Sequence, residues 1–339
     1  MDIEALKKWF LAQKRDFSWR ISPTPYGVWI SEVMLQQTRA SVVEGHFERW
    51  MILFPDVKTL ALAPQVEIIK AWEGLGYYNR ARNLHLAAKY ILEKYEGVIP
   101  DNREELEKIK GLGPYTVGAL LNFAFHQKAA AVDANVTRVL ARYYYVEEDV
   151  TKAKTKQLIQ LKTENLLPET EPWVCMEALI ELGSLVCSKV AKCIKCPIKR
   201  GCRARELKSQ HRLPKKPPKK KVQLLHRNVI VLVYQDSVLL RKTESGLMAD
   251  LYEFPYFEKE KSQEEILLTF LSREAIYQQH LNAVNHTFTH FKATLLPSVW
   301  RALRKEIFSN YIWVLKKDLV KFPFSAGHRK IIQQIEGIR

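Results

Sequence analysis

The spacing of apolar residues changes once along the chain. In the N-terminal part, apolar positions recur at i, i+3, i+4 and i+7, the spacing of one α-helix face, for example over 117–124 and 136–143. In the C-terminal part they form short runs typical of β-strands, at 229–234, 238–240, 293–296 and 311–315. Two helical stretches, 263–279 and 326–335, lie among these runs. The pattern predicts a mainly α first part and an α+β second part.

A basic segment that contains prolines separates the two parts. From residue 199 to residue 221 the chain has eleven Lys and Arg against one acid, Glu206, so this segment alone carries +10 of the total charge of +16. Like charges repel one another, and Pro214, Pro217 and Pro218 remove backbone donors, which favours an extended chain. We therefore predict a linker at 211–222, a solvated spacer that can also contact phosphates.

Length and charge limit the possible function classes. A chain of 339 residues suits two domains, and 47% hydrophobic residues argue against a disordered or fibrous protein. With 53 Lys and Arg against 37 Asp and Glu, the expected partner is a polyanion, either nucleic acid or an acidic membrane surface. No apolar run approaches the roughly eighteen residues of a membrane span, and the first residues do not resemble a signal peptide. We expect a soluble intracellular protein.

Four of the five cysteines lie close together. Cys187, Cys193, Cys196 and Cys202 have the spacing C-x5-C-x2-C-x5-C, whereas Cys175 stands alone in an apolar stretch. In a reducing compartment such a group indicates a metal or cluster site rather than disulfides. Because cysteine thiolates bind zinc as well as iron–sulfur clusters, the spacing leaves the metal open.

The clearest local motif is 111–116 (GLGPYT). It follows a predicted helix that is capped by Asp101, with Glu104 three residues further on. We expect Gly111 and Gly113 to adopt positive φ and Pro114 to begin the next helix. The motif predicts a helix-hairpin-helix, whose free amides at a helix N-terminus can bind a phosphate.

Two carboxylates are candidates for chemistry. Asp133 directly precedes a helical pattern, so it can cap that helix, act as an ionised carboxylate whose pKa the helix terminus lowers, or do both. Glu32 has mostly apolar neighbours and shares a helix face with Trp29. Either burial raises its pKa and makes it a proton donor near neutrality, or it lies on the solvent side of the helix.

The two carboxylates together suggest a reaction. Cleavage of a glycosidic bond requires one carboxyl group with a raised pKa, as the acid, and one with a depressed pKa, as the anion beside the oxocarbenium-like centre. On a nucleic acid the bond that breaks joins base to sugar, and the base must first leave the stack.

These motifs resemble, in their order along the chain, those of one family. The segments 29–38 (WISEVMLQQT) and 72–78 (WEGLGYY), the hairpin motif, 132–135 (VDAN) and the cysteine loop occur as in adenine DNA glycosylases. This family belongs to the helix-hairpin-helix superfamily, which also contains endonuclease III. The resemblance covers nearly the whole chain.

The resemblance implies a multidomain fold. We expect a mainly α helix-hairpin-helix DNA glycosylase with an iron–sulfur cluster loop, followed by an α+β Nudix-like domain. The implied boundaries are a cluster lobe at 1–20 and 130–210, a six-helix barrel lobe at 21–129, the linker at 211–222 and the Nudix-like domain at 223–339.

The resemblance also implies catalytic roles. Glu32 matches the general acid that protonates adenine at N7, and Asp133 matches the carboxylate that stabilises the oxocarbenium ion. Tyr115 and Asn135 match residues that line the same pocket. A glycosylase that also nicks the strand needs an amine to form a Schiff base, and endonuclease III has a lysine at the place of Tyr115. We therefore predict monofunctional excision, with water as the eventual nucleophile.

Further positions are implied to contact DNA or a cofactor. Gln37 and Tyr77 match residues that wedge into the duplex beside the flipped base, and Trp19 and Arg20 match a pair near the adenine pocket. Gly111 and Gly113 belong to the DNA-binding hairpin. The ligands of one [4Fe-4S] cluster are matched by Cys187, Cys193, Cys196 and Cys202, although their first gap is one residue shorter than the family's usual six.

The C-terminal domain resembles the Nudix-like module with which this family examines the base opposite adenine. Phe288, Thr289 and His290 fall where the family commonly has Phe-Ser-His, and threonine keeps the hydroxyl that would contact 8-oxoguanine. From the residues alone, Thr289 would be a strand-surface residue. At 273–278 (REAIYQ), Tyr and Gln stand where a Nudix hydrolase helix has a glutamate pair, which predicts recognition rather than nucleotide hydrolysis.

The resulting hypothesis is a monofunctional glycosylase of base excision repair. We expect it to remove adenine from double-stranded DNA with an A:8-oxoguanine or A:G mispair, as a DNA-associated monomer of the bacterial cytoplasm without membrane contact. Two alternatives stay open: an endonuclease III-like glycosylase for another lesion, and a non-catalytic iron–sulfur DNA-binding protein. Glu32 and Asp133 argue against the second, because binding an anion does not require two carboxylates.

Overall fold

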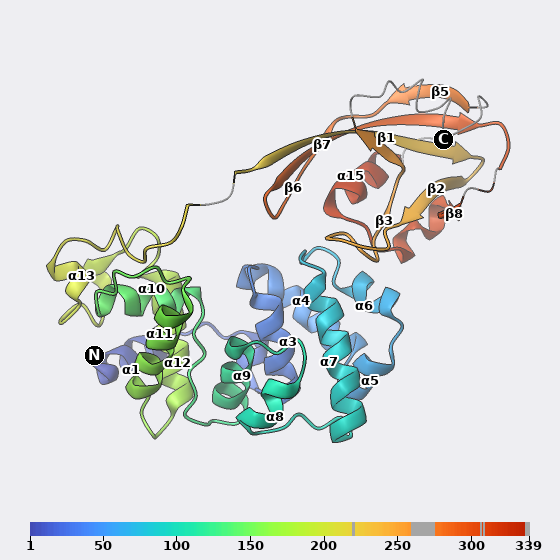
Figure 1. Cartoon of the computed structure of the whole chain (residues 1–339). Helices are drawn as coiled ribbons and strands as arrows, with labels where there is room; N and C mark the ends of the chain where they lie inside the picture. Colours follow the sequence, from blue (N-terminus) through green and yellow to red (C-terminus); the bar gives the residue numbers. More distant parts are fainter. Residues whose placement is uncertain (219–220, 259–274, 306, 308, 336–339) are drawn as a thin grey trace. The chain divides into compact units, whose positions relative to one another are not determined.

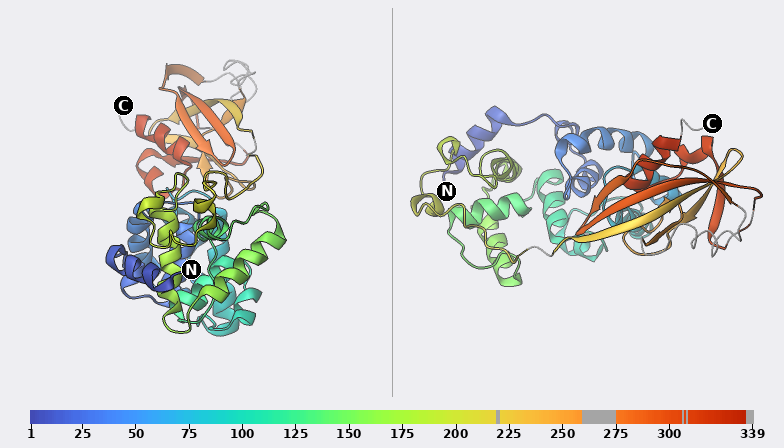
Figure 2. Two further views of the ribbon diagram at one scale, coloured as in Figure 1. Left: turned by 90° about the vertical axis from the view of Figure 1, so that its left-hand side faces the viewer. Right: turned by 90° about the horizontal axis from the view of Figure 1, so that it is seen from above.

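The chain forms two compact units. The computed structural model describes residues 1–339 except 219–220, 259–274, 306, 308 and 336–339. The first unit consists of Met1–Leu62 and Asn83–Pro218, and the second of Ala63–Arg82 and Lys219–Arg339. Figure 1 and Figure 2 show the helices of the first unit and the mixed sheet of the second. Among the described residues, no helix has the length and apolarity needed to cross a membrane.

Every regular element of the first unit is helical, as the apolar spacing predicts. Two short turns of other types, η1 (Leu120–Ala124, a π-helix) and η2 (Cys193–Lys195, a 3-10 helix), accompany the α-helices. The α-helices are α1 (Ile3–Gln13), α2 (Ser18–Ile21), α3 (Pro25–Leu35), α4 (Ala40–Leu53), α5 (Val57–Leu62), α7 (Asn79–Tyr95, from residue 83), α8 (Arg103–Lys108), α9 (Pro114–Ala119), α10 (Ala134–Tyr143), α11 (Ala153–Leu166), α12 (Pro172–Leu185) and α13 (Arg203–Glu206).

Helix α3 runs through the core of this unit. It begins where Pro25 can take the first helical position, and the Thr24 hydroxyl accepts a hydrogen bond from the Gly27 N–H at 3.0 Å. All its residues from Tyr26 to Met34 are buried. A helix that is apolar on every side belongs in a core, and a carboxylate on such a helix is buried with it.

The hairpin around 111–116 differs from the prediction in two details. The N-cap of α8 is Asn102, whose side chain accepts a hydrogen bond from the Glu105 N–H at 3.0 Å, so the predicted cap at Asp101 is wrong by one residue. Gly111 has the expected positive φ of 104°, but Gly113 has a φ of −81° because it is the extended N-cap of α9. A residue at that position needs no left-handed backbone.

The second unit is built on a mixed sheet that packs against helix α15. Strands follow the order β3-β2-β1-β7-β5, and the two long strands β1 and β7 run parallel to each other. Helix α15 lies against the sheet (Figure 1), and its Ile331 and Ile332 join Phe254 and Phe324 in the core. The elements are α6 (Gln65–Ala71), β1 (Gln223–Tyr234), β2 (Ser237–Lys242), β3 (Tyr252–Glu253), β4 (Tyr256–Glu258), β5 (Ala275–His280), β6 (Val284–Phe288), β7 (Phe291–Ala302), β8 (Tyr311–Leu315), η3 (Lys316–Lys321) and α15 (Ala326–Ile335).

The sequence predicts most of this unit, but one predicted helix is wrong where it can be tested. The four predicted strands lie within β1, β2, β7 and β8, and the helix at 326–335 is α15. Of the predicted helix at 263–279, residues 263–274 lie outside the described part, and Ala275–His280 is strand β5. That segment pairs antiparallel with β7, and sheet hydrogen bonding overrides its weak helical pattern.

Candidate active site

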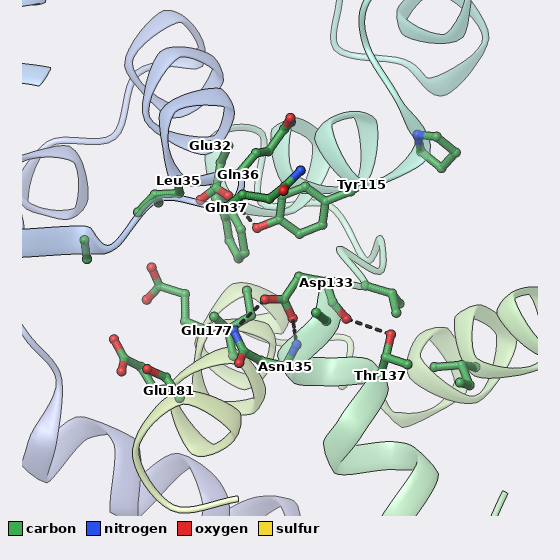
Figure 3. Close-up of a pocket in the computed structure, with 18 of the residues that line it drawn as sticks. Glu32, Leu35, Gln36, Gln37, Tyr115, Asp133, Asn135, Thr137, Glu177 and Glu181 are labelled. Atoms are coloured by element: carbon green, nitrogen blue, oxygen red, sulfur yellow. Dashed lines mark hydrogen bonds between the residues drawn. The ribbon is translucent and has the colours of Figure 1, made fainter. Parts of the chain in front are cut away.

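A large cavity lies in the first unit. Its volume is about 1230 Å³, and residues of α2, α3, α9, α10, α11 and α12 line it. Figure 3 shows Glu32 and Tyr115 on one side of the opening and Asp133 and Asn135 on the other. Tertiary structure thus brings together seven of the predicted site residues: Trp19, Arg20, Glu32, Gln37, Tyr115, Asp133 and Asn135.

Glu32 is a buried carboxyl group on α3. It is 8% exposed, and its Oε2 accepts a hydrogen bond from the Tyr115 hydroxyl at 2.5 Å. Burial raises the pKa of Glu32 to about 7; the Tyr115 hydrogen bond and the positive charge of Arg20 oppose this shift, and the negative charge of Asp133 adds to it. Glu32 is therefore partly protonated at neutral pH, as the sequence predicts.

Tyr115 holds its proton firmly. Burial and the negative charges of Glu32 and Asp133 raise the pKa of Tyr115 well above its usual value. The hydroxyl consequently acts as a hydrogen-bond donor to Glu32 rather than as a base. Its position at the start of α9 follows from the hairpin, because Pro114 directly before it opens that helix.

Asp133 caps α10 with its own side chain. Its Oδ1 accepts hydrogen bonds from the N–H groups of Asn135 and Val136 at 2.8 and 2.7 Å, and its Oδ2 accepts one from the Asn135 side-chain amide at 2.7 Å. These bonds favour the charged carboxylate, but burial outweighs them and raises the pKa of Asp133. The predicted lowering of this pKa is therefore wrong, because the helix terminus lies inside the protein instead of at its surface.

A second pair of carboxylates lines the cavity, and the sequence analysis missed it. Glu177 and Glu181 lie one turn apart on the otherwise apolar helix α12 and face Arg20, which contacts them at 3.0 and 2.8 Å. Arg15 also contacts Glu181, at 2.9 Å. Glu177, like Glu32, is an acid within an apolar helix, and this local pattern could have identified it. Trp19, which also lines the cavity, is buried and stacks on Phe17 with ring centroids 4.6 Å apart.

The two predicted wedge residues share an unusual backbone. Gln37 and Tyr77 have φ of 58° and 49°, in the left-handed region that few residues other than glycine adopt. Gln37 lines the cavity in the first unit. Tyr77 lies in the second unit, is 44% exposed as a residue, and does not line the cavity. Exposed side chains on such a strained backbone are available to a partner.

The four clustered cysteines line one small cavity of about 30 Å³. Among the described residues, no three His, Cys, Asp or Glu side chains converge closely enough to hold a single metal ion. Four thiols around one cavity, Cys187, Cys193, Cys196 and Cys202, are a donor set that both a zinc ion and an iron–sulfur cluster take.

Two arginines of α10 connect the cysteine loop to the cavity. Arg138 donates to the Cys187 carbonyl and to the Asn135 side chain, both at 2.7 Å. Arg142 is buried and donates to the Cys187 sulfur at 3.3 Å and to the Ser188 carbonyl at 2.7 Å. The loop that carries the cysteines is thus fixed to the helix that Asp133 begins.

The other residues that the sequence predicts to contact DNA do not line the cavity. Gly111 turns the hairpin and Gly113 caps α9, and neither lines the cavity. In the second unit, Phe288 ends β6, and Thr289 and His290 form the two-residue turn to β7. Thr289 has a φ of 48°, so interpreting it as a strand-surface residue is wrong. It is presented at the tip of a hairpin, where loops commonly carry function.

Comparisons with known families match the helical part and the sheet-bearing part of the chain. The model of the "HhH-GPD superfamily base excision DNA repair protein" family matches residues 30–165, and the model of the "NUDIX domain" family matches residues 228–334. In solved structures, a thermostable thymine-DNA glycosylase matches with a TM-score of 0.56 at 28% identity, over 60% of this chain and 95% of that one. An endonuclease III–DNA complex, at 22% identity over 61% of this chain and 94% of that one, matches with a TM-score of 0.53 and shows the same fold. These likenesses confirm the predicted fold.

Adenine DNA glycosylases are among the proteins of similar sequence. The adenine DNA glycosylase of Buchnera aphidicola subsp. Baizongia pistaciae is 31% identical over 88% of this chain and 85% of its own length. The adenine DNA glycosylase of Homo sapiens is 30% identical over 86% of this chain and 65% of its own length. With a helix-hairpin-helix base excision unit, a Nudix-like unit and relatives matched over most of the chain, this protein is a DNA glycosylase that belongs to the adenine DNA glycosylase family.

Proposed function

We propose that this enzyme excises adenine mispaired with 8-oxoguanine or guanine, and that it does so without cutting the strand. The observation that supports this most is the cavity faced by Glu32, whose pKa of about 7 keeps it partly protonated, and by Asp133, whose carboxylate accepts three hydrogen bonds. One group can give a proton while the other holds a negative charge, which is the division of roles that glycosidic cleavage needs.

In the proposed reaction Glu32 donates its proton to N7 of an extruded adenine. The bond from C1′ to N9 breaks, its electron pair leaves with the base, and positive charge develops on the sugar. Asp133 stabilises that charge, and water then adds to C1′ and loses a proton. Tyr115 orients the Glu32 carboxyl group through its hydrogen bond. Asn135 fixes the Asp133 carboxylate through two hydrogen bonds, so neither group must reorganise during the reaction.

The other predicted residues would hold the substrate. Gln37 and Tyr77, exposed on left-handed backbone, are proposed to occupy the space that the extruded base leaves. Trp19 and Arg20 would line the adenine pocket beside Glu177. In the second unit, Phe288, Thr289 and His290 would contact the opposite base, with the Thr289 hydroxyl as the group that detects 8-oxoguanine.

We also propose a structural [4Fe-4S] cluster held by Cys187, Cys193, Cys196 and Cys202. Bound there, the cluster would supply a covalent cross-link between α12, the loop and α13. The hydrogen bond that Arg142 donates to the Cys187 sulfur at 3.3 Å would hold this ligand in place. The division of the first unit into a cluster lobe (1–20 and 130–210) and a barrel lobe (21–129) stays a prediction, as do the monomeric state and a bacterial cytoplasmic location.

Release of adenine tests the proposed function directly. The purified protein should release free adenine from a duplex with A opposite 8-oxoguanine or guanine, and strand breaks should appear only after alkali treatment. A duplex with A opposite T serves as the control and should stay intact. Strand cleavage without alkali, together with covalent trapping by borohydride, would contradict monofunctional excision.

Replacing Asp133 by Asn should remove the charge but keep the fold. Asparagine is also a good N-cap, so its side-chain oxygen can still accept from the N–H groups of Asn135 and Val136. We expect single-turnover excision to fall by at least about 10²-fold while duplex binding persists. Asp149→Asn is the matched control, because Asp149, which is partly exposed, accepts similar bonds from Thr151 but does not line the cavity. Near wild-type excision by Asp133→Asn would disprove the role.

The rate of excision should depend on pH through Glu32. This group must be protonated, and its pKa is about 7, so the single-turnover rate should decline as the pH rises through 7. At acidic pH the rate should fall again, because Asp133 must be ionised and its pKa is raised. Glu32→Gln should lower the rate by about 10² to 10⁴-fold and abolish the decline above pH 7. A wild-type rate constant that does not change from pH 6 to pH 8.5 would argue against this acid.

Metal analysis distinguishes the cluster from zinc. Purified protein should be brown and contain about four iron atoms and four acid-labile sulfides per chain. Cys196→Ser should lower the iron content, whereas Cys175→Ser should not, because Cys175 is buried within α12 and does not line the cysteine cavity. One zinc per chain without iron would refute the proposal.

A further inference from the structure

The charged groups around the large cavity do not all neutralise one another. Five carboxylates and six cations line it. Within the first unit, which is described without gaps, most of these groups form ion pairs. Arg15 pairs with Glu181 at 2.9 Å, and Arg20 pairs with Glu177 at 3.0 Å and with Glu181 at 2.8 Å. Arg103 pairs with Glu164 at 3.8 Å. The unpaired acids are Glu32 and Asp133, and the unpaired cations are Arg39, Lys156 and Lys216.

The position of Lys216 follows from contacts of its own segment. Leu213 is 3% exposed, and its carbonyl accepts a hydrogen bond from Arg142 at 3.0 Å. The Lys215 carbonyl accepts one from the Val150 N–H at 3.1 Å. The first residues of the basic segment are therefore held against α10 and the turn before α11. This attachment brings Lys216 to the cavity, where it is exposed and unpaired.

Lys215, the neighbour of Lys216, differs from it both in its ion pairing and in its position relative to the cavity. Lys215 forms an ion pair with Glu147 at 3.3 Å and does not line the cavity. Lys156, on α11, resembles Lys216: it is exposed, lines the cavity and has no carboxylate partner among the described residues. Two adjacent lysines in one segment thus face different surroundings.

We infer that Lys216, together with Lys156, binds backbone phosphates of the DNA strand whose base enters the cavity. This inference rests on the proposed function, because it takes the cavity as the site of the extruded base. The ionised Asp133 carboxylate inside the cavity repels a polyanion, and cations at the cavity offset that repulsion where the phosphates of the strand must pass. Exposed lysines without carboxylate partners exchange counterions for phosphate when DNA binds.

The basic segment therefore has two functions. Lys216 belongs to the surface that binds the strand, and the residues that follow it connect the chain to the second unit. A phosphate contact fixes the register of a strand without reading its sequence. Lys216 is thus a binding residue near the cavity and not part of a mere spacer.

The salt dependence of DNA binding tests this role. The full-length protein is titrated with a duplex that carries a tetrahydrofuran abasic analogue opposite guanine, between 50 and 200 mM salt, so that no excision interferes. Lys216→Gln should reduce the slope of log K against log salt by about 0.9, the value for one lost phosphate contact, and Lys156→Gln should do the same. Lys215→Gln should leave the slope at the wild-type value. Lys216→Arg, which keeps the charge, should also retain it.

The results separate this inference from the proposed function. An unchanged slope in Lys216→Gln, or an equal loss in Lys215→Gln, overturns the phosphate contact even when the wild-type protein releases adenine normally. Conversely, if the wild-type protein releases no adenine but Lys216→Gln alone of the two adjacent variants loses slope, the proposed function fails and the phosphate contact stands.

Discussion

The close passage of one backbone segment between two helices is the constraint on which the active site depends. The residues before and at the start of α10 pass Gly118 of α9 on one side and Gly183 of α12 on the other. A Cβ atom on Gly118 would lie 2.1 Å from the Ala130 carbonyl oxygen, and one on Gly183 would lie 2.5 Å from the Asn135 Cβ. Only a residue without a side chain allows such an approach. The two glycines therefore fix the segment that carries Asp133, and with it the position of Asp133 relative to α3.

Given that geometry, burial determines the chemistry of the carboxyl groups. Glu32 and Asp133 are both shielded from water, and burial is the largest cause of the raised pKa of each. Their surroundings then differ. Glu32 receives one hydrogen bond, from a tyrosine that keeps its proton, whereas Asp133 receives three, two of them from the free amides of a helix N-terminus. The same fold thus supports a proton donor on one side of the cavity and a carboxylate on the other.

Sequence reasoning succeeded where a local pattern carried the signal. The helical spacing, the N-cap at Asp133, the positive φ of Gly111 and the burial of Glu32 each depend on a few neighbouring residues. It failed where distant contacts decide. The direction of the Asp133 pKa depends on how deeply α10 is buried, and strand β5 exists because it pairs with β7. Glu177 and Glu181 lie on an otherwise apolar helix, and only the packing of α12 shows that they face the cavity.

By itself the sequence determined the family, the mainly α and α+β parts, and which residues could carry acid–base chemistry, because these properties reside in motifs and in local periodicity. Only the tertiary structure decided that residues from α2, α3, α9 and α10 line one cavity, that Arg20 faces two further carboxylates, and that adjacent Lys215 and Lys216 have different surroundings. The physical reason is that ion pairing, desolvation and access to a cavity depend on groups far apart in the chain, and their distances are set by packing.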